Sequence, residues 1–503
     1  MEYSNEIKSK KTLDISIKSI LLISSILFLH VYGTKIGVVN YVVLMIEVLG
    51  ILIALSKGNL VWAFLALTIS LTCAMEIPSF VYPIGSTRPL YSIFSMPIAS
   101  IFPFYILTIV LFLISYQQYG RFHLIGYPKN SPIRKFLRLL PVMFFSGFLT
   151  GLITFLINDN GIGNYSWVTT AFFTTSLRIL SLICFISTGF FVIISSEEAR
   201  KKIETTFVEI LFSFGIVGTL TVLLGWHGYY GANEAIMLMP LASSFCPLLI
   251  LLPSFYNVKR SYIYYIVSIG FTFESLLYSS LMGSKFYLVP LLGILVAIVT
   301  SFRKGRMKVF LVATITILIL VINYADILNL LTANTFVNWK FTQFLNTFSL
   351  SAGRGGLVSW YGNMDASPRF RIDEFVNIFN EYMEKPWFAL FGKGNAGCIK
   401  HSWGTTNWQN ANGAFSEAQI SSGIYINVHE SANVLFLRHG LIGLYFFVFT
   451  IWNLLKRLFK SPWALGGFIW FFFFWGVYVS WWIGAVMLVF ALADCNSIGE
   501  NSF

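Results

Sequence analysis

Residues 367–386 read SPRFRIDEFVNIFNEYMEKP, and they lie within 326–431, the only long polar segment of this 503-residue chain. The sequence is 56% hydrophobic and 11% charged, and runs of about 17 to 25 apolar residues recur on both sides of the polar segment. Such runs are typical of membrane-spanning helices. The sequence therefore predicts an all-α polytopic membrane protein with about 12 to 14 transmembrane helices and one large extracytoplasmic loop that contains an amphipathic helix.

The apolar runs divide the chain into three parts. We expect transmembrane helices 1 to 11 in residues 1–325, the large loop in 326–431 and the C-terminal transmembrane helices in 432–503. The last run, 464–493, is long for one upright helix and short for two, which predicts a tilted helix or a pair broken near Ser480. Other predicted spans lie at 15–34, 38–56, 59–77, 139–157, 167–195, 206–224, 309–325 and 432–455.

The net charge of +12 does not come from the large loop. The loop holds seven Lys and Arg residues against eight Asp and Glu residues, so the excess belongs to alternate short turns. Basic turns mark the cytoplasmic side of a membrane protein, which predicts that the large loop is on the outer face. A nucleic-acid partner is not implied. The basic turns lie at 121–138, 200–202, 303–308 and 456–460.

Residues 367–386 have the signals of a complete helix. Ser367 and Pro368 are typical of a helix start, and Pro386 ends the pattern. Its apolar residues recur at helical spacing, which predicts a helix that lies on the membrane surface or packs on the bundle. The apolar stripe consists of Ile372, Phe375, Val376, Phe379 and Met383.

Two arginines, Arg369 and Arg371, fall at the start of this helix, where the helix dipole is already positive. They suit a bound phosphate or diphosphate, because guanidinium groups and free backbone N–H groups both bind anions. The alternative is that they pair with Asp373 and Glu374. Residues 391–397, FGKGNAG, are likewise open to two interpretations, an anion-binding turn or an ordinary Gly-rich turn after a helix, and the second is commoner.

His429 begins a stripe that continues through Asn433, Phe436 and Gly440 on one face of the predicted helix 432–455. A histidine at the outer membrane surface is suited to act as a general base, because its unperturbed pKa is near neutrality. The alternative is a structural histidine. Gly440 removes a side chain about three turns below it, which allows a neighbouring helix or a lipid to approach closely.

Several ionisable residues fall inside predicted spans, where they are costly. Arg178 and Arg438 should face the bundle interior, with Glu47 and Glu274 as candidate partners in ion pairs. These arginines are open to two interpretations, internal ion pairs and contacts with a substrate. The five cysteines predict neither a disulfide framework nor a metal site, and the loop has no aspartate-rich pair, so we expect chemistry that needs no metal or cofactor.

Together these motifs resemble the O-antigen ligase and polymerase superfamily. His429, ten residues and Gly440 match an H-x10-G segment, and Arg371 precedes Pro386 by the interval found in the family's amphipathic helix. Residues 228–233, GYYGAN, resemble the Gly-aromatic-x-Asn stretch of the family. The resemblance covers roughly residues 206–455.

The chain departs from the family pattern upstream of that stretch. Gly225 occupies the position of a phosphate-binding arginine, and His227 is the nearest polar candidate, with Asn233 a few residues on. Arg178 or Arg354 is therefore a candidate substitute for that arginine. Arg438 stands where many members of the family have an acidic residue.

The resemblance implies an inverting, metal-independent glycosyl transfer at the periplasmic face of the bacterial inner membrane, with an undecaprenyl diphosphate-linked oligosaccharide as donor. In this reading Arg371 with Arg369 holds the diphosphate, His429 takes the proton of the acceptor hydroxyl, and Gly440 makes room for the polyprenyl chain within the membrane lipid. A chain-length regulator protein is a candidate partner. The loop tryptophans are candidate sugar-stacking surfaces or structural anchors: Trp339, Trp360, Trp387, Trp403 and Trp408.

Within the family the length of the chain and the size of its loop favour an O-antigen polymerase, which joins repeat units, over an O-antigen ligase, which transfers finished polymer to lipid A-core. From another class, a transporter of lipid-linked oligosaccharide or polysaccharide is the alternative. A transporter is expected to line a central cavity with several charges and to show paired halves. The scattered intramembrane charges and the one dominant loop of this chain fit a transporter less well.

Overall fold

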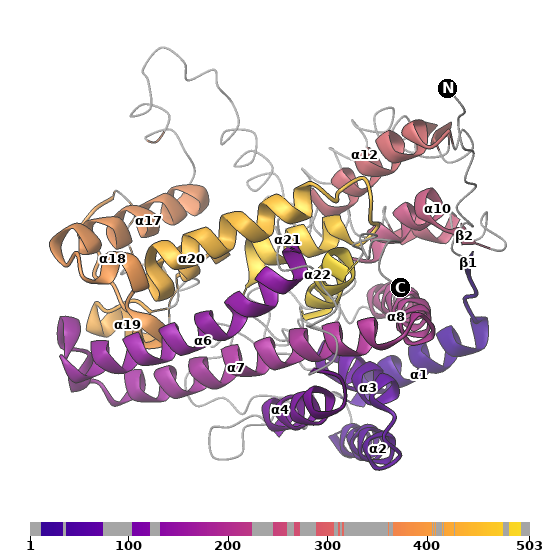
Figure 1. Cartoon of the computed structure of the whole chain (residues 1–503), viewed down its shortest axis with the longest axis horizontal. Coiled ribbons are helices and arrows are strands. Elements are labelled where there is room, and N and C mark those ends of the chain that lie inside the picture. Colours follow the sequence, from indigo (N-terminus) through magenta and orange to yellow (C-terminus); the bar gives the residue numbers. More distant parts are fainter. Residues whose placement is uncertain are drawn as a thin grey trace.

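The structure is a computed structural model, and the part of the chain that it describes is almost entirely helical (Figure 1). The described residues are 12–33, 37–73, 103–120, 131–223, 245–258, 266–271, 288–305, 310–311, 314–315, 361, 366–404, 406, 408, 415, 417–426, 428–475 and 482–493. Within them the strands are β1 (Thr12–Leu13) and β2 (Asn257–Val258), which pair in parallel.

Four helices are long and apolar enough to cross a membrane. They are α6 (Pro132–Leu156), α7 (Ser166–Ser195), most of α8 (Glu197–Leu223) and α20 (Ser431–Leu455). On α20 the exposed residues Leu441, Tyr445, Val448 and Trp452 recur at helical spacing, as expected for a face turned to lipid. The chain is thus a helical membrane protein. The predicted total of 12 to 14 spans stays a prediction, because several predicted spans fall partly or wholly outside the described residues.

Shorter apolar helices complete the bundle. In the N-terminal half they are α1 (Ile17–Gly33), α2 (Gly37–Ser56), α3 (Leu60–Cys73) and α4 (Pro103–Ser115), which the π-helix η3 (Tyr116–Gly120) continues. Further along they are η5 (Cys246–Leu251), α10 (Leu252–Phe255) and α12 (Leu288–Arg303). In Figure 1 α6 and α7 run side by side along the long axis, and α20 lies against α6.

Two helices begin earlier than predicted. α6 starts at Pro132 instead of 139, because Ser131 accepts a hydrogen bond from the backbone N–H of Arg134 (3.3 Å) and caps the first turn. α8 starts at Glu197 instead of 206 and carries acidic residues in its first turn, where the helix dipole favours them. The basic residues of both segments therefore lie on helices and not in turns.

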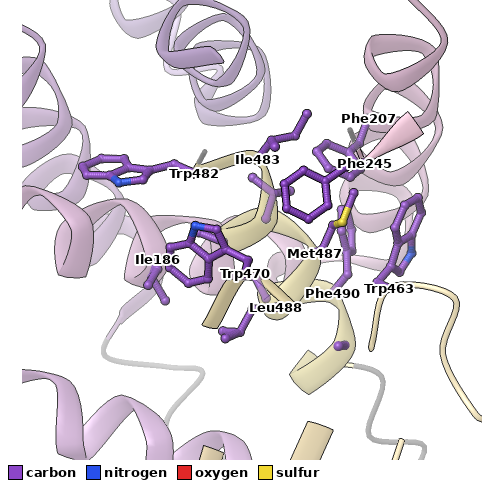
Figure 2. Packing of buried hydrophobic residues seen from close by; sticks show 14 of the residues in the cluster. Ile186, Phe207, Phe245, Trp463, Trp470, Trp482, Ile483, Met487, Leu488 and Phe490 are labelled. Atoms are coloured by element: carbon purple, nitrogen blue, oxygen red, sulfur yellow. The ribbon is translucent and has the colours of Figure 1, made fainter. Parts of the chain in front are cut away.

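The last apolar run forms a pair of helices, α21 (Ala464–Phe474) and α22 (Ile483–Ala493), which pack on each other. Each has 11 residues, so each is about 16 Å long, roughly half the thickness of a bilayer core. Of the two alternatives for this run, the structure has the broken pair. Figure 2 shows Trp470 and Leu488 from this pair packed beside Ile186 of α7.

The described part of the polar segment gathers at one end of the bundle (Figure 1). It forms α17 (Ala366–Glu384), α18 (Phe388–Phe391), the short 3-10 helix η8 (Gly394–Ala396) and α19 (Glu417–Ser422). The turn between α18 and η8 enters the bundle and contacts α6, α7 and α20. Two glycines with positive φ make this possible: a Cβ on Gly394 would overlap the Gly151 backbone of α6, and one on Gly392 would overlap the backbone of α20.

The opposite end of the bundle collects positive charge. The N-terminus of α6 with Arg134 and the C-terminus of α20 with Lys456 lie away from α17, and α8 begins there with Arg200 and Lys201. Because α6 and α20 both run from one end to the other, the polar segment and these basic residues belong to opposite ends of the bundle.

Candidate functional site

α17 confirms the predicted helix of the polar segment, including its end before Pro386. Its buried residues are mixed, because the polar Asp373, Glu374 and Asn377 are almost completely buried together with Phe370, Ile378 and Tyr382. The predicted apolar stripe is partly exposed: Phe379 is 48% exposed and Met383 68% exposed. Polar and apolar residues of α17 both contact α20, since Asn433 bonds Glu374 and Phe375 stacks on Phe436. Phe379 and Met383 are exposed and thus available to a membrane surface.

Glu374 receives hydrogen bonds from three groups at the start of α20. Its carboxylate accepts the backbone N–H of His429 (2.9 and 3.0 Å) and the side-chain amide of Asn433 (3.1 Å). The Nδ1 atom of His429 lies 2.6 Å from its Oε1. The amide of Asn433 also donates to the backbone carbonyl of Arg371 (3.0 Å), so α17 and α20 are joined at this point.

This arrangement fixes the chemistry of the His429 ring. A carboxylate only accepts hydrogen bonds, so Nδ1 donates to Glu374, and in the neutral ring Nε2 is left as the basic atom. The ring meets Phe370 and Phe415 edge to face (centroids 5.5 and 5.8 Å apart), while the side chain stays 28% exposed. His429 is therefore held in one orientation and still reaches the surface, as a general base requires.

His429 lies just before the helix and not on it. α20 begins at Ser431, and Glu430 has φ +62°, a backbone conformation that side chains rarely adopt. The predicted stripe of His429 with Asn433 thus comes from shared contact with Glu374 and not from helical spacing.

Arg371 forms an ion pair that the sequence analysis did not include. Its Nε lies 2.7 Å from Oε1 of Glu430, whereas Asp373 bonds Tyr361 and Thr406. The described ion pair of Arg371 is thus with Glu430, and Glu374 acts on Arg371 through its charge. Burial lowers the pKa of Arg371, and the charge of Glu374 opposes that shift. Arg369 lies with its guanidinium 5.7 Å from the centre of the Tyr361 ring.

Arg178 and Arg438 lie close enough for their charges to act on each other. Arg178 donates from Nε to the hydroxyl of Tyr105 (3.2 Å), and its charge acts on Arg438. The predicted partner Glu47 accepts a hydrogen bond from Ser70 (2.9 Å). The other predicted partner, Glu274, lies outside the described residues.

Gly440 breaks α20 with φ +59°. A Cβ at this position would overlap the carbonyl of Ala389 and the backbone of Gly392, so the predicted close approach is made by the chain's own α18 and the following turn. The role of Gly440 toward a lipid chain stays a prediction. The other candidate substrate contacts, His227, Asn233 and Arg354, lie outside the described residues.

A second polar cluster holds the loop on the bundle. Nζ of the fully buried Lys393 lies 2.6 Å from both Asp159 and Glu381, and Nζ of Lys385 lies 2.5 Å from Asp159 and 2.8 Å from Glu381. Burial would raise the pKa of Glu381, but the charge of Lys393 and the hydrogen bonds from both lysines and Asn160 outweigh it and lower the pKa. The turn 391–397 is therefore anchored through Lys393, which favours the ordinary turn over an anion-binding one.

The loop aromatics have different environments. Trp408 is fully buried and stacks on His401 (centroids 4.7 Å apart), so it belongs to the loop core. Trp387 and Trp403 are exposed, and Trp339 and Trp360 lie outside the described residues. Among the described residues, no three His, Cys, Asp or Glu side chains come together as metal ligands.

Sequence reasoning missed Glu430 and the orienting role of Glu374. Glu374 carries one signal: it follows Arg371 by three residues on the same helix face. Glu430 carries none beyond its place next to His429.

Comparison with models of known protein families, with curated protein sequences and with solved structures finds no match.

Proposed function

We propose that this protein is an O-antigen polymerase that joins undecaprenyl diphosphate-linked repeat units at the periplasmic face of the bacterial inner membrane. The reaction is an inverting glycosyl transfer that needs no metal and no cofactor. The observation that carries the proposal is the pair of Glu374 and His429 next to Arg371, where the polar loop joins the membrane bundle. The resemblance of the His429 and Arg371 segments to the O-antigen ligase and polymerase superfamily supplies the reaction class.

In the proposed reaction His429 is the general base. The hydroxyl oxygen of the acceptor sugar attacks the anomeric carbon of the donor sugar, and Nε2 of His429 takes the hydroxyl proton. The bond between the anomeric carbon and the phosphate oxygen breaks at the same time, and the electron pair leaves with the diphosphate. Glu374 keeps Nδ1 as the donor and stabilises the imidazolium that forms, because it is a buried carboxylate 2.6 Å away.

Arg371 is the candidate residue for binding the diphosphate leaving group. Its ion pair with Glu430 leaves it partly exposed, so a diphosphate with a larger negative charge can replace Glu430 as its partner. Arg369 lies two residues earlier, near the start of the same helix, and would act with it. Arg178, Arg354, His227, Asn233 and Gly440 remain candidate substrate contacts.

The donor's lipid suits the surroundings of the site. The exposed apolar residues of α17 and α18 lie at the end of a bundle whose outer faces are apolar, so the site opens at a lipid boundary. A lipid-linked donor thus reaches the site with its polyprenyl chain in the membrane. The polar loop would contact the sugars, and a chain-length regulator protein would act from outside this chain.

The proposal is tested by the lipopolysaccharide ladder of a strain that lacks the gene. Complementation with the wild-type gene should restore the ladder, and complementation with His429→Ala or Arg371→Ala at matched expression should not. A null strain with core and a single repeat unit is the expected result. Core alone, with polymer left on its lipid carrier, would identify an O-antigen ligase with the same site. A full ladder from both alanine variants would refute the site.

A further inference from the structure

Trp403 is an exposed tryptophan that the fold holds in a fixed position. It is 40% exposed, whereas Asn377 of α17, which bonds its backbone, is 1% exposed. The side-chain oxygen of Asn377 accepts the backbone N–H of Trp403 (2.9 Å), and the amide of Asn377 donates to the backbone carbonyl of Trp403 (2.8 Å). Residues of exposed loops are usually more mobile than this. A buried amide thus fixes the place of an exposed indole.

The residues on both sides of Trp403 are held on α17 as well. Ser402 donates from its backbone N–H (2.8 Å) and from its hydroxyl (2.9 Å) to the same oxygen of Asn377. A Cβ on Gly404 would overlap the carboxyl group of Asp373, so the backbone that follows Trp403 lies directly on this helix. The segment 402–404 is therefore a fixed part of the loop.

Tyr361 stands beside the indole as a second ring. The ring centroids of Tyr361 and Trp403 lie 5.4 Å apart, and the ring planes meet at 41°. The hydroxyl of Tyr361 donates to Asp373, and the guanidinium of Arg369 lies 5.7 Å from the centre of the Tyr361 ring. The two rings thus present apolar surfaces at an angle to each other, with polar groups beside them.

This pair of rings lies away from the residues of α17 that are available to lipid. Asn377 precedes the exposed Phe379 by two residues, about 200° around the helix, so the two side chains leave nearly opposite faces. Glu374, which orients His429, lies between Asp373 and Asn377 in the sequence. Residues 373–377 of α17 therefore hold both the pair of rings and the proposed base, on the side of the helix that faces the polar loop.

The other described tryptophans of the loop have different surroundings. Trp408 is fully buried and belongs to the loop core. Trp387 is 64% exposed, but it directly precedes α18, whose Leu390 and Phe391 are exposed apolar residues of the kind that a membrane surface covers. Trp403 is thus the described loop tryptophan that is exposed, fixed and set among polar groups.

We propose that Trp403 and Tyr361 form a stacking site for a sugar ring of the repeat unit. A pyranose ring has C–H groups on its faces and hydroxyl groups around its rim, so it matches a flat aromatic surface with polar groups beside it. Rings that are already fixed lose little conformational entropy when a ligand binds. Stacking of a sugar does not depend on the proposed reaction, and only the identification of the sugar with the repeat unit rests on the proposed function.

The test measures binding to the purified full-length chain in detergent, without turnover. The probe is the free repeat-unit oligosaccharide, released from its lipid carrier by mild acid, and calorimetric titration gives the dissociation constant. We expect Trp403→Ala to weaken binding about tenfold or more, and Trp403→Phe, which keeps a flat ring, to weaken it about threefold or less. Trp387→Ala, which removes an exposed tryptophan of the same loop, is the matched control and should bind as the wild type does.

Melting temperatures and kinetic constants complete the test. Trp403 is exposed, so its variants should melt at the wild-type temperature. With the free oligosaccharide as acceptor and the lipid-linked unit as donor, a raised KM for the acceptor in Trp403→Ala at unchanged kcat would place the acceptor's sugar on the indole. A raised KM for the donor alone would place the donor's sugar there. The proposal is overturned if the wild type does not bind the oligosaccharide, if Trp403→Ala binds it equally well, or if Trp387→Ala loses as much affinity.

The outcomes also distinguish this site from the proposed function. Unchanged binding in Trp403→Ala, together with core and a single repeat unit in the null strain, removes the sugar site and leaves the polymerase proposal in place. Binding that depends on Trp403, in a chain whose His429→Ala and Arg371→Ala variants restore the full ladder, supports the sugar site and removes the proposed catalytic residues.

Discussion

Nδ1 of His429 and Oε1 of Glu374 lie 2.6 Å apart although the residues are 55 positions apart in the sequence. Glu374 comes from the third turn of α17 and His429 from the residues just before α20, so the pair exists only because the polar loop folds back on itself. Three neighbouring residues hold this contact. Asn433 of α20 bonds the same carboxylate, and Phe370 and Phe415 meet the ring edge to face.

Replacing Glu374 should therefore impair catalysis through His429. Glu374→Gln keeps the shape but removes the charge that favours the imidazolium, and we expect polymer formation to fall about 10- to 100-fold. His429→Ala should cause a loss of about 100-fold or more. The rate of polymer formation from purified lipid-linked repeat units measures both.

The control for this prediction is Glu417→Gln, which removes an exposed carboxylate of α19 in the same loop. It should leave the rate unchanged. Equal rates for Glu374→Gln and the wild type would mean that the buried carboxylate serves only to hold the loop.

The ion network of Glu381 should make the stability of the loop depend on acid pH. The folded-state pKa of Glu381 is lowered, so its contribution is complete above the unfolded value, about 4.3, and is lost as the pH falls through the folded value. The melting temperature in detergent should thus drop between about pH 5 and pH 3. Glu381→Gln should destabilise the protein at pH 7 by about 3 kcal/mol, because it removes a partner of the buried Lys393.

Lys385 makes the stability that the same network provides depend on alkaline pH as well. Burial would lower its pKa, but the bonds and charges of Asp159 and Glu381 outweigh burial and raise it. Its contribution to stability is complete below the unfolded pKa, about 10.4, and is lost above the folded pKa.

The control for the acid dependence is Glu384→Gln, which changes an exposed neighbour on α17 and should keep the wild-type acid profile. An acid profile that Glu381→Gln leaves unchanged would contradict the assignment.

The sequence was sufficient to predict the helices that apolar runs and helix start and stop signals define. α7 and α20 begin and end within one residue of their predicted bounds, and α17 ends before Pro386 as predicted. These features depend on local composition. The broken pair at 464–493 was one of two predicted alternatives, and choosing between them required the packing of α21 on α22.

The site depends on contacts that no local pattern reports. Arg371 pairs with Glu430, 59 positions later, and Lys393 pairs with Asp159 from the turn between α6 and α7. The apolar stripe of α17 predicted a helix on the membrane surface or packed on the bundle, and it did not report which polar residues of the helix would be buried. The buried residues of α17 include Glu374 beside Phe370 and Ile378.

The turn at Gly394 should tolerate no side chain. Gly394 has φ +70° and its Cβ would overlap the Gly151 backbone, so Gly394→Ala combines backbone strain with overpacking and should cost about 3 kcal/mol or more. Gly423→Ala is the matched control, since Gly423 has φ +66° but nothing within 4 Å. It should cost only the strain, about 1 kcal/mol. Melting temperatures in detergent measure the difference, and equal shifts would refute the close packing of the turn.

The two ends of the bundle should face opposite sides of the membrane. α20 joins the polar loop at Ser431 and ends at the basic residues Lys456 and Arg457, and its 25 residues are long and apolar enough to cross a membrane. In spheroplasts, a membrane-impermeant maleimide should label Glu417→Cys before lysis and Lys456→Cys only after lysis, each compared with the parent chain. Both positions are exposed, so poor access within the fold would not explain a difference. Labelling of both positions before lysis would place the two ends on one side and would contradict a membrane-spanning α20. Labelling of Lys456→Cys alone would place the loop in the cytoplasm and would remove the periplasmic reaction proposed for it.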